Sequence, residues 1–200
     1  MATTPVSDTE HLQRLLHGMA RCVSTKGYGA TTIADIVSEA AVSRRTFYEH
    51  FATKADCLMA LYESVSLDAL SVLKSQVKPD VPWRDQVQDA LTDYFGWMAK
   101  NPVLMRALFI DILALGADGL KVRRRMHQEI AEFISETVNN ARLNTPALSG
   151  DLIIALVGGI HELVLHQSEK SDVFNVAELV QISADLVCRV FAESDGNTID

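Results

Sequence analysis

The chain has 200 residues, of which 48% are hydrophobic and 22% are charged, and this composition is typical of a folded globular protein and excludes disordered, collagen-like and fibrous chains. Its net charge of −8 is unevenly distributed, because residues 1–54 contain six Lys/Arg and five Asp/Glu whereas the other 146 residues contain 12 and 21. This asymmetry indicates two different tasks along one chain.

Apolar residues recur at steps of three and four through most of the sequence, which predicts an all-α fold of about nine helices. Thr32 with Asp35, and Thr53 with Asp56, have the spacing of a capping box, and Ser43 is a good N-cap. In chain order, the expected helices span residues 10–25, 32–40, 43–49, 53–77, 83–100, 103–115, 120–142, 149–168 and 175–193.

The two short helices over residues 32–40 and 43–49 have the proportions of a helix-turn-helix. At ~1.5 Å per residue the second is about 10 Å long, which suits the ~12 Å wide major groove of B-DNA. Phe47 and Phe51, four residues apart, are expected on its buried face. We therefore predict a DNA-binding domain over residues 1–54.

The residues around the second short helix carry the chemistry of DNA recognition. Arginine grips guanine with two hydrogen bonds and threonine contacts thymine, so Arg44, Arg45 and Thr46 are candidates for reading bases. Candidates for phosphate contacts are Thr32, Tyr48, His50 and Lys54. The alternative interpretation is that the two arginines are merely solvated, with Arg45 paired to Glu49 four residues later.

The segment GYGATTIADI (27–36), followed by AAVSRRTFYEHF (40–51) and Thr53-Lys54, resembles the DNA-binding domain of TetR-family transcriptional regulators over about residues 8–62. The resemblance implies a homodimer that places two recognition helices in successive major grooves of a palindromic operator and usually represses. It assigns the same seven residues to phosphates and bases. Ala41 departs from the family's usual turn glycine, so either a left-handed backbone carries a cost or the turn differs. Phe47 replaces the more common leucine.

Residues 55–200 are expected to form a helical regulatory domain, to which the resemblance assigns ligand binding and dimerisation. The helix over 149–168 is apolar on nearly every side, and Gly158-Gly159 in its middle favours close helix approach. With the helix over 175–193 it can form a four-helix interface across a two-fold axis, or both can complete one monomer's core. The interface candidates are Leu156, Gly159, Leu163, Leu179, Leu186 and Val190.

A ligand pocket is expected among the aromatic and methionine residues of this domain. The absence of charged clusters there favours an apolar or aromatic small-molecule inducer. His161 and Glu162 stand out, because ionisable groups in an apolar helix need partners or water; a pocket contact, an interface hydrogen bond and exposure at a bend all stay open. The pocket candidates are Phe95, Met98, Met105, Phe109, Met126, Phe133, His161 and Glu162.

Export signals and cofactor motifs are lacking. The N-terminus has neither the basic flank nor the apolar run of a signal peptide, and the longest apolar run, 152–160, is too short to cross a bilayer. Three widely spaced cysteines argue against a disulfide scaffold or zinc finger. We therefore expect a cytoplasmic protein without metal or cofactor.

The leading hypothesis is a ligand-responsive repressor that an inducer releases from its operator. One alternative is a small helical enzyme using His161 and Glu162, but no phosphate-binding loop, nucleophile elbow or metal motif accompanies them, so we expect no enzyme. The other is a helical protein-binding scaffold, which would leave Arg44 and Arg45 without a task.

Overall fold

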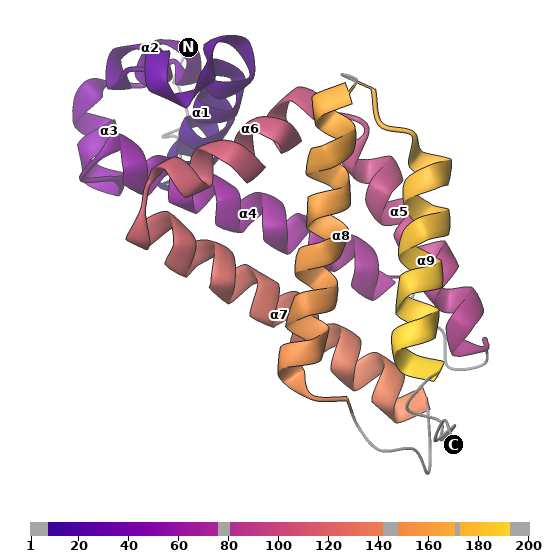
Figure 1. The fold of residues 1–200 in the computed structure, drawn as a ribbon. Coiled ribbons are helices and arrows are strands. Elements are labelled where there is room, and N and C mark those ends of the chain that lie inside the picture. Colours follow the sequence, from indigo (N-terminus) through magenta and orange to yellow (C-terminus); the bar gives the residue numbers. More distant parts are fainter. Residues whose placement is uncertain (1–7, 76–80, 142–147, 171–172, 193–200) are drawn as a thin grey trace, which may run out of the picture. The chain divides into compact units, whose positions relative to one another are not determined.

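The computed structural model describes residues 8–75, 81–141, 148–170 and 173–192, and this part of the chain consists of nine α-helices without a strand (Figure 1). The predicted all-α fold is confirmed, and the expected helices are present with most ends within a few residues of those predicted; the predicted ends at residues 77, 142 and 193 lie outside the described residues. None of the described helices is long and apolar enough to span a membrane. The helices are α1 (Asp8–Ala30), α2 (Ile33–Ala40), α3 (Arg44–His50), α4 (Lys54–Ser75), α5 (Trp83–Met98), α6 (Pro102–Ala114), α7 (Ala117–Ala141), α8 (Gly150–Lys170) and α9 (Val176–Ala192).

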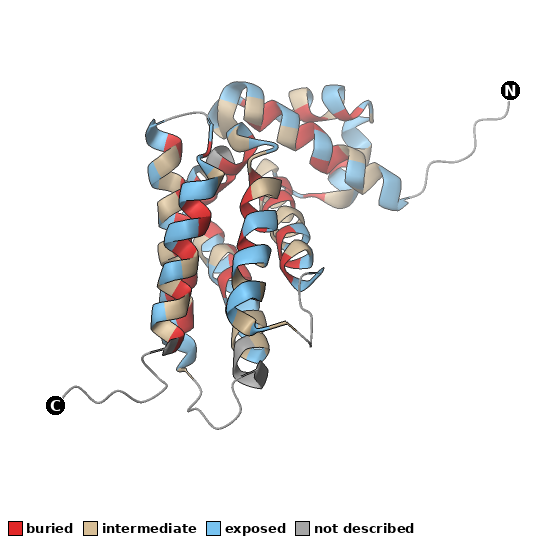
Figure 2. Cartoon of the chain, turned by 90° about the vertical axis from the view of Figure 1, so that its right-hand side faces the viewer, coloured by how far each residue is buried: buried red, intermediate tan, exposed pale blue. Residues whose placement is uncertain are grey.

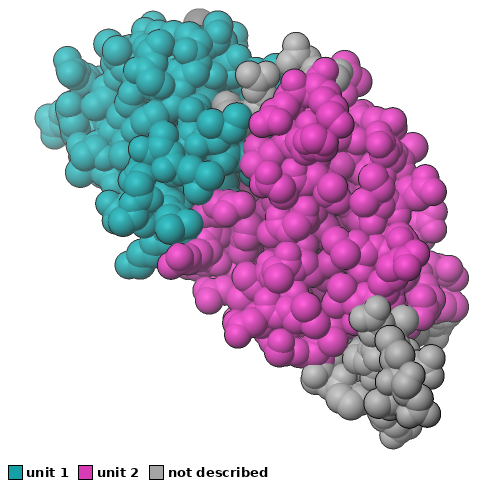
Figure 3. Space-filling view, viewed as in Figure 1, with its two compact units in different colours: residues 1–65, 103–122 teal, residues 66–102, 123–200 magenta. Residues whose placement is uncertain are grey.

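The helices are distributed over two compact units (Figure 3). Unit 1 comprises residues 1–65 and 103–122, and unit 2 comprises residues 66–102 and 123–200. Unit 1 therefore contains α1, α2, α3 and all of α6 except its first residue, and unit 2 contains α5, α8 and α9. Helices α4 and α7 each cross a unit boundary, after residues 65 and 122, so each of these two helices has residues in both units.

Unit 1 is built on the packing of α1 against α2. Gly18 permits this close approach, since a Cβ atom there would lie 2.8 Å from the carbonyl oxygen of Ile36. Buried side chains form stripes along the helices (Figure 2). The largest fully buried side chains of this unit include Leu15, Met19, Ile36, Phe47 and Leu58.

Local hydrogen bonds fix where the short helices begin. Thr32 and Asp35 exchange both bonds of a capping box at the start of α2. The Ser43 hydroxyl accepts from the N–H of Thr46 (3.0 Å) at the start of α3. Thr53 accepts from the N–H of Asp56 (3.1 Å) and donates its own N–H to that carboxylate (2.8 Å). All three predicted caps are confirmed.

The expected break after the first helix is present as a kink. Gly27 has φ 76 and ψ 161, a backbone conformation that glycine adopts without steric cost, and one further turn continues to Ala30. The residues after this kink lie in unit 1, and the N–H of Tyr28 donates to the carboxylate of Asp111 on α6 (3.2 Å).

Unit 2 has a separate core in which α5 and α8 both contact α9. Apolar side chains at helical spacing form one face of each of these helices, and that face is buried in the core, as expected for amphipathic segments. The fully buried side chains of this core include Phe95, Met98, Ile153, Leu179 and Phe191.

Candidate nucleic-acid interface and ligand cavity

The turn between α2 and α3 is left-handed. Ala41 has φ 51 and ψ 47, and its N–H donates to the carbonyl of Ser38 (3.2 Å). Arg14 of α1 donates from Nε to the carbonyl of Ala40 (2.9 Å) and from Nη2 to that of Ala41 (2.6 Å). Of the two alternatives left open by the sequence, the strained left-handed backbone is the one observed, and Arg14 holds it.

One face of α3 packs against the core of unit 1, and the opposite face is exposed to solvent. Phe47 is fully buried and its ring centroid lies 5.7 Å from that of Phe51, so the predicted buried face is confirmed. Arg44, Arg45 and Tyr48 are exposed on the other face. These three side chains are available to a partner approaching the outer face of α3.

Arg45 forms the ion pair with Glu49 that the alternative interpretation expected, with 3.0 Å between Nε and Oε1. The pair lies at the surface, since the Arg45 side chain is 89% exposed. Exposed pairs of this kind contribute only ~0.5 kcal/mol. A DNA base can therefore compete for the guanidinium at small cost.

Thr32 and Thr46 are placed at helix starts, as their candidate roles require. The hydroxyl of Thr32 donates to the carboxylate of Asp35 (2.6 Å), and that of Thr46 lies 2.8 Å from the hydroxyl of Ser43. Hydrogen bonds from Lys26 and Thr32 hold the pKa of Asp35 below its usual range, so this carboxylate stays ionised and keeps the start of α2 ordered.

Lys54 and His50 are turned toward the chain itself. Lys54 donates from Nζ to the carbonyls of Tyr28 (2.9 Å) and Thr31 (2.7 Å), which leaves one of its three N–H donors for a phosphate. His50 has a side chain that is only 10% exposed, and its Nε2 lies 3.5 Å from the carboxylate of Asp8. Both therefore order the domain whether or not they also contact DNA.

Sequence reasoning missed the ionic contacts that join α1 to α2. Lys26 pairs with Asp35 (2.6 Å) and Arg21 with Glu39 (2.8 Å), in addition to the Arg14 contacts with the turn. No local pattern could have signalled them, because each partner depends on how α1 crosses α2.

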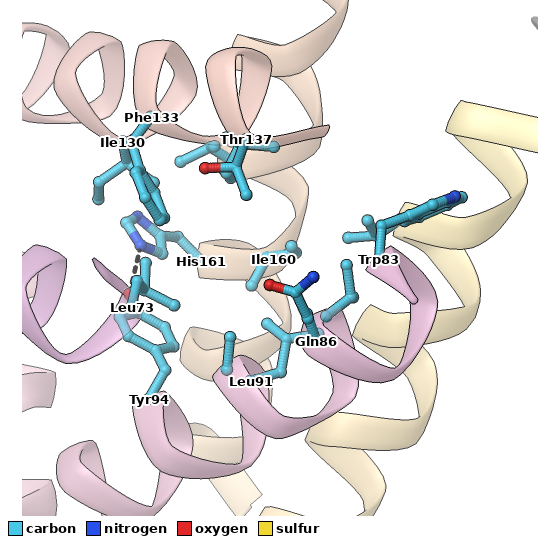
Figure 4. A pocket seen from close by; sticks show the side chains of 15 residues that line it. Leu73, Trp83, Gln86, Leu91, Tyr94, Ile130, Phe133, Thr137, Ile160 and His161 are labelled. Carbon is cyan, nitrogen blue, oxygen red and sulfur yellow. Dashed lines mark hydrogen bonds between the residues drawn. The ribbon is translucent and has the colours of Figure 1, made fainter. Parts of the chain in front are cut away.

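Unit 2 contains a cavity of about 100 Å³ with an almost entirely apolar wall (Figure 4). Side chains from the end of α4, the first three turns of α5 and Tyr94 beyond them, the second half of α7, the middle of α8 and the second half of α9 contribute to it. Such a wall suits an apolar ligand. Its polar members are Trp83, Gln86, Tyr94, Thr137 and His161.

A chain of buried hydrogen bonds reaches the cavity wall. The hydroxyl of Tyr94 lies 2.9 Å from Nε2 of His161, and Nδ1 of His161 lies 2.8 Å from Nε2 of His127. Burial lowers the pKa of His127 to about 4 and holds that of His161 well below its usual value, with the Arg123 charge adding to both effects. Both imidazoles are therefore neutral at pH 7.

The predicted pocket residues separate into three groups. Phe133 and His161 line the cavity. Five others are buried but are not in its wall: Phe95, Met98 and Met126 in unit 2, and Met105 and Phe109 in unit 1. Glu162 is exposed, so it does not converge with the buried His161 on one site. No sequence pattern distinguishes Trp83 and Tyr94 as cavity residues, since aromatic residues recur at the same helical spacing in a cavity wall and in a filled core.

The predicted interface residues also differ in burial. Leu156 and Leu179 are buried within the single chain, whereas Gly159, Leu163, Leu186 and Val190 are partly exposed. Among the described residues, no atom outside the helix's own nearby backbone lies within 4 Å of a Cβ built on Gly158 or Gly159. The described part of the chain therefore does not supply the close helix approach expected at these glycines.

No cluster of three His, Cys, Asp or Glu side chains among the described residues could hold a metal ion. His127 and His161 face each other, but Glu162 and His166 are exposed.

Residues 15–61 match the family model described as "Bacterial regulatory proteins, tetR family". A curated relative, the uncharacterized HTH-type transcriptional regulator YvdT of Bacillus subtilis (strain 168), is 24% identical over 152 residues, which cover 73% of this chain and 74% of that protein.

Solved structures share the fold over nearly the whole chain. The fatty acid degradation regulator FadR from Bacillus halodurans has a TM-score of 0.75 at 14% identity, covering 94% of this chain and 96% of that one. The transcriptional regulator FadR from Bacillus subtilis, solved in complex with stearoyl-CoA, has a TM-score of 0.67 at 15% identity, covering 88% and 96%. At these identities the similarity shows the fold alone.

Proposed function

We propose that this chain, whose residues 15–61 match the TetR family model and whose curated relative is an HTH-type transcriptional regulator, is a TetR-family transcriptional regulator: a homodimeric repressor that leaves a palindromic operator when a small molecule enters the cavity of unit 2. In this proposal residues 1–54 bind DNA in the cytoplasm and residues 55–200 dimerise and bind the ligand. The observation that carries it is the outer face of α3, where two arginines and a tyrosine are exposed beside a fully buried Phe47.

The individual roles follow from exposure and hydrogen bonding. Arg44 and Arg45 read bases, with Thr46 at the start of α3 beside them, because these side chains are closest to the groove that α3 would enter. Tyr48 and Thr32 contact phosphates. Lys54 and His50 contribute less to phosphate binding, since their polar atoms contact the chain itself.

The dimer is supported by the outer faces of α8 and α9. Leu152 and Ile182 are large apolar side chains that remain 43% and 44% exposed, and among the described residues a Cβ atom built on Gly159 would meet no atom of another helix within 4 Å. A second copy of the chain that packs on these helices would bury the apolar groups and supply the close approach that the glycines lack.

The ligand response requires a coupling element, and α4 is suited to this role. It is one continuous helix from Lys54, beside the DNA-binding motif, to Leu73 and Ser75, and Leu73 lines the cavity. A ligand that favours one tilt of α4 shifts the population of DNA-competent dimers, and its differential affinity for the two states limits the loss of operator binding.

An enzymatic role is not proposed. His161 has both ring nitrogens engaged by Tyr94 and His127, and Glu162 is exposed. The acid–base pair that an enzyme would need is therefore not supported by the geometry.

The test is a gel shift with the DNA upstream of the protein's own gene, across a salt series, together with sedimentation to determine whether the free protein is a dimer. We expect saturable binding that weakens with salt and is at least 100-fold weaker in Arg44→Ala/Arg45→Ala, since each bidentate base contact is worth about 1–3 kcal/mol. The matched control, Arg124→Ala/Arg125→Ala, removes two exposed α7 arginines.

Unchanged affinity in the α3 variant would overturn the proposed roles of the two arginines. If the wild type bound upstream DNA no better than random duplex, site selection from genomic fragments would follow. Failure there would overturn the proposed repressor.

A further inference from the structure

The polar side chains in the wall of the unit 2 cavity differ in whether the protein itself satisfies them. The hydroxyl of Tyr94 lies 2.9 Å from Nε2 of His161, whose Nδ1 lies 2.8 Å from Nε2 of His127. The amide nitrogen of Gln86 donates to the carbonyl of Val81 (2.6 Å). A ligand that drew on these nitrogens would have to break a hydrogen bond that the protein already makes, which offsets what it gains.

Thr137 is the exception among these polar side chains. It lies on α7 one turn after Phe133, it is half-buried, and no described residue forms a hydrogen bond with its hydroxyl. Trp83 also carries a polar atom, but its indole nitrogen lies at the end of the ring that is farthest from His161 (Figure 4). The hydroxyl of Thr137 is therefore the polar group of the described wall that a ligand can engage without breaking an existing bond.

The cavity is small and uncharged. Its described lining residues include no Lys, Arg, Asp or Glu, and burial keeps the His127 and His161 imidazoles neutral by lowering their pKa values. An anion placed there would lose its hydration without gaining a cation, which is costly. An apolar cavity of ~150 Å³ holds benzene, so the volume of about 100 Å³ admits one small ring or a short branched chain and has no room for a long chain.

We propose that the cavity binds a neutral molecule of about one ring that carries a single hydroxyl or carbonyl group. Its apolar part packs against the buried side chains of Leu91 and Ile160, and its polar group hydrogen-bonds to the Thr137 hydroxyl. The inference rests on the proposed function in taking this cavity as the ligand site. A threonine hydroxyl both donates and accepts, so it serves a ligand hydroxyl or a ligand carbonyl.

Direct binding of probes to the full-length protein tests the charge and the chemistry of the ligand. We would titrate the protein by calorimetry with p-cresol, toluene and p-toluate, which share a methylbenzene ring and differ in carrying a hydroxyl, no polar group and a carboxylate. We expect both neutral probes to bind and p-toluate to bind at least 10-fold more weakly than p-cresol. Binding of p-toluate as tight as that of p-cresol, or no binding of p-cresol, overturns the proposal.

A fourth probe, 4-hexylphenol, tests the size limit, because it has the same phenol as p-cresol with a longer chain. Each additional buried CH₂ would raise the affinity about 4-fold. Since one ring fills the buried part of the cavity, we expect 4-hexylphenol to bind no more tightly than p-cresol. Tighter binding would contradict the limit of one ring and overturn the proposal.

Variants then locate the polar group and the ring. Thr137→Val removes the hydroxyl and keeps the branched shape, so it should weaken p-cresol binding about 5-fold, the effect of one hydrogen bond, and leave toluene binding unchanged. The matched control, Thr92→Val, changes an exposed threonine of α5 that donates to the carbonyl of Gln88 (2.7 Å) outside the cavity wall, and it should bind both probes normally. Ala90→Trp, which adds a large side chain to a half-buried position of the wall, should abolish binding of both. Normal p-cresol binding in either Thr137→Val or Ala90→Trp overturns the proposal.

The two proposals can fail separately. A protein that binds its operator but none of the probes refutes the ligand class and leaves the repressor intact. A protein that binds p-cresol through Thr137 but binds no DNA supports the ligand class and refutes the repressor. Circular dichroism and a cooperative urea transition establish that Ala90→Trp is folded.

Discussion

Ala41 is a non-glycine residue that is held in the left-handed region, with φ 51, at the turn of the DNA-binding motif. A left-handed backbone destabilises the folded state of a residue with a Cβ atom by roughly 1–2 kcal/mol, and glycine removes this strain. Glycine also stabilises the unfolded chain by ~0.5–1 kcal/mol through its greater conformational freedom, which offsets part of the gain. We therefore expect Ala41→Gly to raise the free energy of unfolding by about 0.5–1 kcal/mol, measured by urea denaturation. Ala34→Gly, at an exposed helical position of α2, is the control and should lower it by ~1 kcal/mol. Equal destabilisation by both variants would show that the turn relaxes without strain.

Arg14 joins two elements, since it leaves α1 and donates to the carbonyls of Ala40 and Ala41 at the end of α2. A cation at a helix C-terminus stabilises unpaired carbonyls and the helix dipole. Arg14→Ala should lower the free energy of unfolding by about 1.5–3 kcal/mol, because two charge-assisted hydrogen bonds are lost, a partly buried one to Ala40 and an exposed one to Ala41. Arg21→Ala, on the same helix, removes only a surface pair with Glu39 and should cost less than ~0.5 kcal/mol. If the two variants were equally stable, Arg14 would not hold the turn.

The neutral histidine pair of unit 2 makes the stability of the whole molecule depend on pH. In the unfolded chain both imidazoles titrate near 6.5, whereas burial lowers the folded pKa of His127 to about 4 and that of His161 well below its usual value. As pH falls below 6.5 the unfolded state binds protons that the folded state excludes, so the free energy of unfolding decreases progressively toward pH 4 and is unaffected by this pair above pH 7.

At about 1.4 kcal/mol per pKa unit, His127 alone lowers the free energy of unfolding by up to ~3 kcal/mol at pH 4. Urea denaturation from pH 7.5 to 4 measures the slope, and His127→Gln, which keeps a hydrogen-bonding side chain beside His161, should make it shallower. Since the carboxylates titrate alike in both proteins, equal slopes would contradict the assignment to His127.

The local features of the fold follow from the amino-acid sequence alone. Helical periodicity predicted the nine described helices. The spacing of threonine, serine and aspartate predicted the caps at Thr32, Ser43 and Thr53. Both kinds of prediction succeed because caps and periodicity depend on residues within one or two turns. The same local logic gave the buried face at Phe47 and the pairing of Arg45 with Glu49.

The contacts between distant residues depend instead on how the helices pack. Of the eight pocket candidates only Phe133 and His161 line the cavity, because a wall and a core are made of the same apolar residues and differ only in whether a neighbour fills the space. The histidine pair joins positions 34 residues apart, and Arg14 caps a helix 26 residues away. Such contacts depend on how helices cross, which no spacing within one helix encodes.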